Sequence, residues 1–400
     1  MASACVICLF ITKPLNAGGR ERQPKFDGAG YFFMNNTMPV TEHQHYNFGG
    51  FETSVHISPC LPGLEDIAHN FGKSFFKPII ICDANTRPFA EKIMGGANTP
   101  LCMLESGEQN KNWRSAETIL RCACDNGIGR DGIFIGVGGG VLTDLCAFAA
   151  SVYMRGCSLA LVATTLLAMA DASIGGKTGF DLAGIKNLVG TFYPARHVYM
   201  PLESLASLPL PELKSGMAEI IKTAVLAGEA ENDSLLDTLC ASAASSMLNG
   251  RHAELAAFIS SAVKLKGGIA EEDPKETGSR RILLNLGHTF GHALESAAGL
   301  GVISHGEAVA WGMARSCELG QNLGICPPGR AEKIRSLLAS CGYETHAPHP
   351  LADSASIMHA IDNDKKKRAG SLFFIVPGEK SAVPVVIESR DTIVKLINGV

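Results

Sequence analysis

The stretch LLNLGHTFGHALE, residues 283–295, with HGEAV starting at His305, says more about this chain than any other. It places His288 and His292 four residues apart on one face of a predicted helix, with His305 a short loop later. Imidazole is the commonest transition-metal ligand, and a histidine pair with this spacing can share one ion. An acidic ligand is available upstream, because GMAEIIKTA contains Glu219. Two histidines and a carboxylate, with one position open for substrate, are typical of catalytic zinc.

The histidine pair also has a plainer interpretation. Two histidines four residues apart on an amphipathic helix are often polar neighbours with no metal between them. The spacing also leaves open whether His292 is a metal ligand or a substrate contact. The neighbouring motifs therefore carry more weight than the pair itself.

The composition indicates a globular protein of about two domains. The chain has 400 residues, 46% of them hydrophobic and 43 of them glycine, with a mean hydropathy of +0.14. A net charge of −4 gives no reason to expect nucleic acid or an anionic membrane as a partner. No apolar run approaches the roughly 20 residues that span a bilayer. Thirteen scattered cysteines are typical of reduced thiols, so we expect a cytoplasmic protein.

The hydrophobic pattern predicts an α/β domain followed by a helical one. Residues 1–45 show no sustained period and are predicted to be a disordered extension. Over residues 46–203, predicted strands (FETSVHISP, KPIIICDAN, GIFIGVGGG) alternate with predicted helices (NWRSAETILRCACDNG, LTDLCAFAASVYMRG), which indicates a parallel sheet. Residues 204–400 are predicted to be almost wholly helical, with a cleft between the two domains.

Three polar segments in the first domain predict a dinucleotide site. GVGGGVLTDL, from Gly136, sets three glycines between a strand and a helix, where backbone N–H groups could meet a pyrophosphate. The motif lacks the G-x-G-x-x-G spacing, so a tight strand-to-helix turn explains it about as well. Asp83 and Asn85 follow a predicted strand and could hold a ribose. Glu108 and Lys111 lie in the polar loop SGEQNK.

The segment IGGKTGFDLAGIKN, from Ile174, is predicted to be a second polar loop. Lys177 follows two glycines, and Lys186 and Asn187 end the segment. The spacing is not that of a P-loop, but a lysine beside backbone N–H groups remains suited to binding phosphate.

Taken together, these motifs resemble one family, the 3-dehydroquinate synthases of the sugar phosphate cyclase group. The matching segments follow the family's order over roughly residues 48–400. They are SGEQNK, GGGVLTDLCAFAASVYMRG, TTLLAMADASIGGKTG, KNLVGTFYP, GMAEIIK, LLNLGHTFGHALE, HGEAVAWGM and NDKKK.

The resemblance implies a role for each matched residue. Zinc or cobalt would be held by Glu219, His288 and His305, which leaves His292 for the substrate. The residues implied to contact NAD are Asp83, Asn85, Glu108, Lys111, Gly139, Gly140, Asp144, Thr164, Thr165, Lys186, Ser204 and Ser207. Those implied to surround the substrate are Arg155, Asp171, Lys177, Asn187, Lys222, Lys266, Arg281, Asn285, His292 and Lys365.

Two departures from the family pattern affect this transfer. ETGSRRILLN, from Glu276, is one residue longer than the usual form, so counting back from Asn285 selects Arg281 whereas counting forward from Lys266 selects Arg280. The glycine of FDLAGIKN also stands one place early. Residues 1–45 have no counterpart.

Family membership would imply an NAD- and metal-dependent lyase of the shikimate pathway, acting as a homodimer. Its substrate would be 3-deoxy-D-arabino-heptulosonate 7-phosphate, which passes through oxidation, phosphate elimination, reduction, ring opening and aldol closure. Other sugar phosphate cyclases, making a valiolone or an inosose, are the nearest alternative. A metal-dependent polyol dehydrogenase shares the two-domain plan but has no use for cations that bind carboxylate and phosphate. An inactive scaffold fits poorly with a complete ligand set.

Overall fold

Strands with apolar residues on both faces form the sheet of the first half of the chain. The computed structural model describes residues 41–72, 77–228, 234–242, 244–248, 254–278, 280–299, 301–367 and 372–399. Within these ranges one sheet has seven strands, in the order β1 (Glu42–Phe48), β2 (Phe51–Ser58), β9 (His197–Pro201), β6 (Ser158–Ala163), β5 (Ile133–Gly138), β3 (Pro78–Asp83) and β4 (Leu101–Leu104). β1 pairs with β2 antiparallel, and the other pairs are parallel. The predicted parallel α/β sheet is confirmed.

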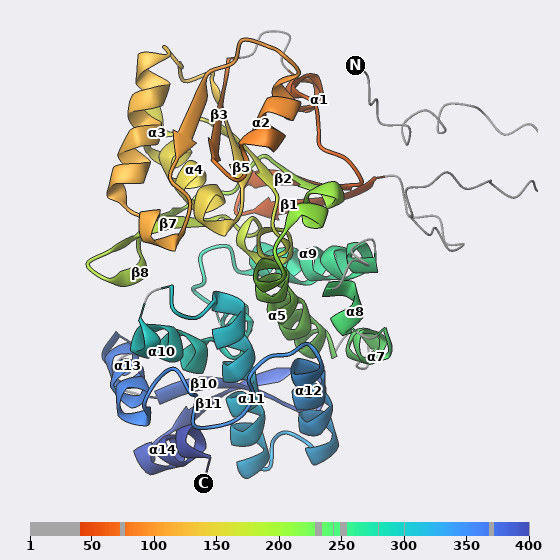
Figure 1. Ribbon diagram of the computed structural model, residues 1–400, viewed down its shortest axis with the longest axis vertical. Coiled ribbons are helices and arrows are strands. Elements are labelled where there is room, and N and C mark those ends of the chain that lie inside the picture. Colours follow the sequence, from red (N-terminus) through yellow and green to blue (C-terminus); the bar gives the residue numbers. More distant parts are fainter. Residues whose placement is uncertain are drawn as a thin grey trace, which may run out of the picture. The chain divides into compact units, whose positions relative to one another are not determined.

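Helices cover both faces of this sheet (Figure 1). Successive side chains of a strand point to opposite faces, so Ile79 and Ile81 of β3 pack in one core while Ile80 and Cys82 pack in the other. The first core includes side chains of α3 (Trp113–Asp125) and α4 (Gly140–Val152), and the second includes those of α1 (Leu64–Asn70) and α2 (Arg87–Met94). Burial on both faces explains the continuous apolar runs of the central strands.

The strand order reverses beside β3. From β3 the chain passes outward to β4 and then returns to form β5 on the other side of β3. In open α/β sheets, ligands bind at such a switch point, outside the carboxyl ends of the strands. Asp83 ends β3, and the glycine turn between β5 and α4 lies at the carboxyl end of the next strand. The topology therefore puts two of the predicted cofactor motifs at the same end of the sheet.

The predicted loop from Ile174 is instead a β-hairpin, so that prediction was wrong. β7 (Lys177–Leu182) pairs antiparallel with β8 (Ile185–Phe192). Ala183 and Gly184 at the tip both have positive φ, as the tightest hairpin turns require. The hairpin packs on α4, and more exposed and less exposed side chains alternate along most of β8. A prediction from the polar composition of the segment does not detect this pattern.

Short helices lie between several of the longer elements. Among the described residues they are η2 (Glu108–Asn110), η3 (Tyr153–Arg155), the π-helix η4 (Ala168–Ala172), η5 (Leu202–Ser207) and η7 (Arg281–Asn285). η4 contacts both α5 and α9, so the segment after β6 reaches the helical half of the chain.

The second half is mainly helical, as predicted, but it also contains a hairpin. Its described helices are α5 (Leu210–Leu226), α7 (Ser234–Ala241), α8 (Ala244–Leu248), α9 (Leu255–Glu272), α10 (His288–Ala298), α11 (His305–Asn322), α12 (Pro328–Ser340), α13 (Ser354–Lys367) and α14 (Arg390–Asn398). β10 (Leu372–Pro377) and β11 (Ala382–Ile387) form an antiparallel pair. Phe374 and Val376 of β10 pack with α10 and α11 residues in a separate core.

The predicted boundary at residue 46 falls inside a strand, because β1 begins at Glu42. Residues 1–40 lie outside the described residues. No helix of the described ranges is long and apolar enough to cross a membrane. No disulfide joins any two of the eleven cysteines in these ranges.

Arg330 links its own helix, α12, to α5 and to the turn between β10 and β11. Its side chain is 6% exposed, and its guanidinium donates to the carbonyls of Gly378, Ser381, Lys380 and Val225 at 2.8–2.9 Å. Arg330→Met should lower the free energy of unfolding by about 3 kcal/mol or more, since charged hydrogen bonds are lost and buried carbonyls are left unpaired. The urea midpoint would measure it.

Lys333→Met, on the same helix, is the matched control for this variant. Lys333 pairs with Asp237 at 2.6 Å on the surface, where an ion pair contributes at most about 1 kcal/mol. Equal midpoints for the two variants would show that Arg330 is not a structural anchor.

Candidate active site

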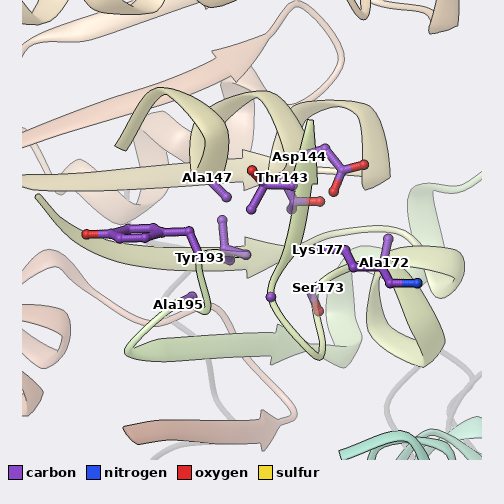
Figure 2. A pocket seen from close by; sticks show the side chains of 11 residues that line it. Thr143, Asp144, Ala147, Ala172, Ser173, Lys177, Tyr193 and Ala195 are labelled. Carbon is purple, nitrogen blue, oxygen red and sulfur yellow. The ribbon is translucent and has the colours of Figure 1, made fainter. Parts of the chain in front are cut away.

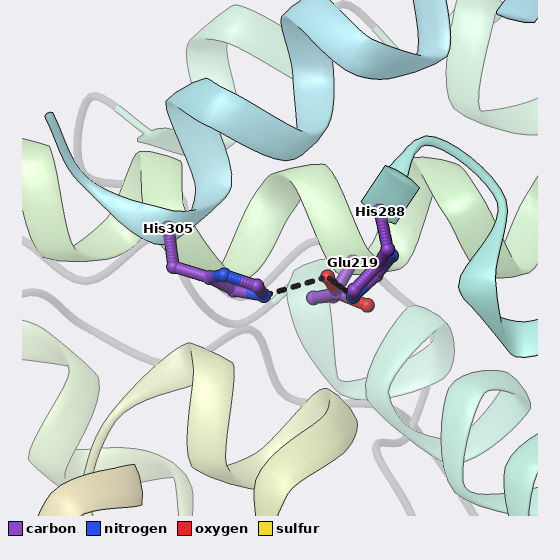
Figure 3. A group of neighbouring side chains, drawn as sticks. All are labelled: Glu219, His288 and His305. Atoms are coloured by element: carbon purple, nitrogen blue, oxygen red, sulfur yellow. Dashed lines mark ion pairs between the residues drawn. The ribbon is translucent and has the colours of Figure 1, made fainter. Parts of the chain in front are cut away.

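Three helices bring Glu219, His288 and His305 together (Figure 3). Glu219 lies in the buried middle of α5, while His288 and His305 are the first residues of α10 and α11. Ser304 caps α11 by accepting from the N–H of Glu307, which fixes where the helix starts.

Close helix contacts hold these positions. A Cβ on Gly312 would lie 2.0 Å from the carbonyl oxygen of Gly287, and one on Gly306 would lie 2.3 Å from the Cα of Ser215. The backbones of α10, α11 and α5 can therefore approach only because both positions are glycine.

The spacing of the three side chains fits a metal site. His288 Nε2 lies 3.7 Å and His305 Nε2 lies 3.6 Å from Glu219 Oε1. These separations are too long for good hydrogen bonds, but bonds of about 2.0–2.2 Å to one tetrahedral ion would set ligand atoms roughly 3.3–3.6 Å apart. Glu219 is 0% exposed; its Oε2 pairs with Lys222, whereas its Oε1, which faces both histidines, has no hydrogen-bond partner among the described residues. A buried carboxylate in this state is suited to an ion.

The second nitrogen of each histidine ring points to an acceptor. His288 Nδ1 lies 3.1 Å from the carbonyl of Leu286, and His305 Nδ1 lies 3.4 Å from Glu295 Oε2. Because a carbonyl and a carboxylate only accept, both Nδ1 atoms carry a proton, so Nε2 is the nitrogen that each ring can offer to a metal, which would displace any proton there. This is the arrangement that metal-binding histidines usually have.

The charges around Glu219 form a buried network. Lys222 contacts Glu219 Oε2 and lies 3.5 Å from Asp171 Oδ1, and Lys266 of α9 lies 2.8 Å from Asp171 Oδ2. Burial alone would raise the pKa of Glu219, but Lys222, His305 and His288 together outweigh it and hold the pKa at about 2. Burial likewise opposes ionisation of Asp171, whose pKa is nevertheless lowered by Lys222 and Lys266. Both carboxylates are therefore anionic at neutral pH.

The two histidines differ in the charge that they favour. Burial, then Lys222, lowers the pKa of His288. Burial also opposes charge on His305, yet Glu219 and Glu295 together raise its pKa to about 9. These two carboxylates thus favour a positive charge at His305. A metal cation bound to this ring would be stabilised by the same carboxylates.

Glu276 belongs to the site, although the sequence analysis did not select it. It forms an ion pair with Lys177, and its Oε1 accepts from Asn285 Nδ2 at 3.5 Å. Glu276 also has a positive φ of 53°, unusual for a side chain of this kind. Its place at the start of ETGSRRILLN, which is one residue longer than usual between its Gly and its Asn, was the one available signal.

The two candidate arginines have different surroundings. Arg281 is 1% exposed, and its Nη atoms donate to the carbonyls of Pro274 (2.7 Å) and Gly175 (2.9 Å). Its Nε is buried without a hydrogen-bond partner in the described part of the chain. Arg280 is exposed and lies 3.2 Å from Glu272. Arg281 is thus the arginine next to the buried network.

A second cluster lies at the carboxyl end of the sheet. Lys111 Nζ donates to Asp144 Oδ2 and to Asn187 Oδ1, both at 2.6 Å. Lys186, beside Asn187 on β8, lies 2.8 Å from Glu295 and 3.5 Å from Glu108. Figure 2 shows Asp144, Ser173 and Lys177 lining one pocket beside α4. Residues of the two segments predicted as polar loops, SGEQNK and IGGKTGFDLAGIKN, therefore lie close together here.

The remaining predicted cofactor residues follow strand ends. Thr164 follows β6, and its buried Oγ1 has no hydrogen-bond partner in the described ranges, while Thr165 Oγ1 accepts from the N–H of Ala168. Asp83 accepts from the N–H of Thr86 at 2.9 Å. The others here are Asn85, exposed in a turn, Gly139 and Gly140, which start α4, and Ser204 and Ser207, which donate to nearby carbonyls.

The three remaining predicted substrate residues are Arg155 at the surface, His292 beside the metal-ligand group, and Lys365, which cannot be placed. Arg155 is exposed at the end of η3. His292 is exposed on α10, with its ring 5.2 Å from that of His288 and 5.9 Å from that of His305. The side chain of Lys365 lies outside what the structure describes.

The family models described as 3-dehydroquinate synthase N-terminal and C-terminal match residues 101–215 and 216–367. The 3-dehydroquinate synthase of Nostoc punctiforme is 35% identical over 80% of this chain and 87% of its own length. That of Methylacidiphilum infernorum is 38% identical over 70% of this chain and 75% of its own.

Solved structures of related cyclases share the fold. A 2-deoxy-scyllo-inosose synthase bound to carbaglucose-6-phosphate, NAD+ and Co2+ matches with a TM-score of 0.76 and 25% identity, over 90% of this chain and 99% of that one. A 2-epi-5-epi-valiolone synthase from Streptomyces hygroscopicus with NAD+ and Zn2+ matches with a TM-score of 0.76 and 26% identity, over 91% and 98%. A glycerol dehydrogenase from Sinorhizobium meliloti, at 14% identity and a TM-score of 0.56, shares the fold alone.

Proposed function

The chain belongs to the 3-dehydroquinate synthase family, and from this membership we propose that it converts 3-deoxy-D-arabino-heptulosonate 7-phosphate into 3-dehydroquinate and phosphate. This is an NAD- and metal-dependent carbon–oxygen lyase reaction of the shikimate pathway, which supplies chorismate and the aromatic amino acids. The observation that carries the proposal is the group formed by Glu219, His288 and His305 beside the buried cations Lys222 and Lys266. A metal site next to cations suits an anionic polyol.

Glu219, His288 and His305 would hold the metal, zinc or cobalt. When bound, it would polarise the substrate hydroxyls and make the one to be oxidised more acidic, so that hydride can pass to NAD+. Lys222 and Asp171, which contact each other near Glu219, are placed to orient those hydroxyls. Since the ammonium groups of Lys222 and Lys266 are hydrogen-bond donors only, they can also bind the anionic groups of the substrate.

The other substrate residues would bind its two anionic ends. Lys266 and Arg281 are proposed to meet the carboxylate, together with Asn285. His292 and Lys177 are proposed to meet the phosphate. Arg155, Asn187 and Lys365 complete the set that the family resemblance assigns to this shell.

The sheet's carboxyl end would bind NAD. Lys111 and Asp144 support this role because they lie beside the glycine turn at the reversal of strand order. The unpartnered Thr164 hydroxyl is a buried polar atom that a ligand could satisfy. The proposed set is Asp83, Asn85, Glu108, Lys111, Gly139, Gly140, Asp144, Thr164, Thr165, Lys186, Ser204 and Ser207. Residues 46–203 would thus form the NAD domain and residues 204–400 the metal and substrate domain.

The other cyclases remain the second candidate. The fold matches the inosose and valiolone synthases, but the identity to these is 25–26%, against 35–38% to the two curated 3-dehydroquinate synthases compared above. We further propose a cytoplasmic homodimer, as family members are expected to be, and cysteines of which no two in the described ranges form a disulfide suit a reducing compartment.

The cofactor balance tests this function. NAD+ supplied far below the substrate concentration should sustain many turnovers without net NADH, because the hydride removed in the first step returns in a later one. Absorbance at the NADH band, followed alongside phosphate release, measures this. Release of one NADH per substrate would instead support a polyol dehydrogenase.

A further inference from the structure

Glu295 is a buried carboxylate of α10 to which the family resemblance gives no role. It follows His288 by seven residues, so both lie on one face of the helix. The residue is 4% exposed. Its two oxygens point to different partners, because Oε2 lies 3.4 Å from His305 Nδ1 and Oε1 lies 2.8 Å from Lys186 Nζ.

Glu295 could in principle be a metal ligand itself, since it clusters with His292 and His305. The charges argue against this. Lys186 already neutralises its carboxylate, and a second cation beside that ammonium would be repelled. The Nε2 of His305 faces Glu219, so the ring's other nitrogen is the one that faces Glu295. Glu295 therefore accepts a hydrogen bond from the proposed metal ligand His305 and is not itself a metal ligand.

Lys186 connects this carboxylate to the sheet half of the chain. It stands on β8 and lies 3.5 Å from Glu108, which is part of the proposed NAD site. The contacts thus run from His305 through Glu295 and Lys186 to Glu108. They join a proposed metal ligand on the helical half to a proposed cofactor contact on the other half.

We propose that Glu295 is a positioning residue with two effects. It orients His305 so that Nε2 faces the metal, and through Lys186 it makes metal binding and NAD binding strengthen each other. The proposal rests on the metal and NAD sites of the proposed function. A contact of this kind typically changes metal affinity by about 10–100-fold, and coupling between two sites is typically about 5–150-fold.

Three variants separate the two effects. Glu295→Leu removes both contacts and should weaken Zn2+ binding by about 10–100-fold. Glu295→Gln keeps an acceptor oxygen for His305 but cannot balance the charge of Lys186, so it should lose the coupling and less of the zinc affinity. Lys186→Met should lose the coupling and keep zinc affinity in the absence of NAD+ near that of the parent protein.

Binding measurements provide the readout, independent of turnover. Zinc affinity is measured by competition with a chelator, with and without NAD+, and NAD+ affinity by calorimetry on metal-free and zinc-loaded protein. In the parent protein the two ratios should agree and be about fivefold or more, since coupling is reciprocal. The absorption spectrum of the Co2+-loaded protein should change in Glu295→Leu but not in Lys92→Met, a surface variant whose lysine pairs with Glu203 at 2.8 Å.

The outcomes distinguish this proposal from the proposed function. If His288→Ala keeps its zinc, the metal site itself is wrong. If His288→Ala loses zinc while Glu295→Leu binds it as tightly as the parent protein does, the positioning role is wrong. Equal NAD+ affinity for the metal-free and zinc-loaded parent protein would overturn the coupling.

Discussion

His288→Ala should lose bound zinc and turnover together, with kcat/KM falling by about a thousandfold or more. The reason is that the metal's contribution of several kcal/mol disappears, at about 1.4 kcal/mol per factor of ten. The protein should stay folded, because His288 is the first residue of α10 and neither hydrophobic core beside it in the described ranges includes a proposed metal ligand. Metal content by mass spectrometry and turnover on the same sample would measure this.

His292→Ala is the matched variant, from the same face of the same helix. His292 is exposed and is proposed to contact the substrate, so this variant should keep its zinc and lose only activity. Loss of zinc in His292→Ala, with zinc retained in His288→Ala, would exchange the roles of the two histidines. This comparison also resolves the choice that the four-residue spacing leaves open.

The substrate's carboxylate should have the second largest effect. We expect kcat/KM for the heptulosonate phosphate to exceed that for sedoheptulose 7-phosphate by about 10⁴, because a site built around polar partners rejects an analogue that leaves them unpaired. Lys266 and Arg281 would be left without that partner, one beside Asp171 and the other with its buried Nε unsatisfied. Initial rates of phosphate release with the two sugars measure the ratio.

Two lysines of α9 provide the control for this prediction. Lys266→Met should lower the preference sharply, whereas Lys264→Met, an exposed position two residues away, should leave it unchanged. Similar kcat/KM values for the two sugars with the parent protein would identify another sugar phosphate cyclase. The shared cyclase chemistry would then stand, and the substrate assignment would not.

Local patterns in the sequence predicted the parts of the fold that depend on periodicity. The apolar runs of β3 and β5 and the amphipathic segment that begins at Asn112 formed the expected elements. The β7–β8 hairpin, predicted as a loop from Ile174, was missed because it is stabilised by packing on α4, which is distant in sequence. The β10–β11 hairpin was missed for a similar reason, since its buried residues pack against α10 and α11.

The candidate site shows the same division. Motifs were enough to select Glu219, His288 and His305, which the structure brings within 4.8 Å of one another. Glu295 lies inside the quoted motif but was not selected, because its importance comes from His305 and Lys186 on other elements. Glu276 depends in the same way on Lys177 of β7. Contacts across elements cannot be read from spacing along one of them.

The most direct test of the account is the identity of the product. Purified protein with zinc, NAD+ and the heptulosonate phosphate should release one phosphate for each 3-dehydroquinate formed, measured by a phosphate assay and by mass spectrometry of the same sample. Omitting the metal by chelation should stop both, and adding zinc back should restore them. No phosphate release from the fully loaded protein, or phosphate release without 3-dehydroquinate, would contradict the account.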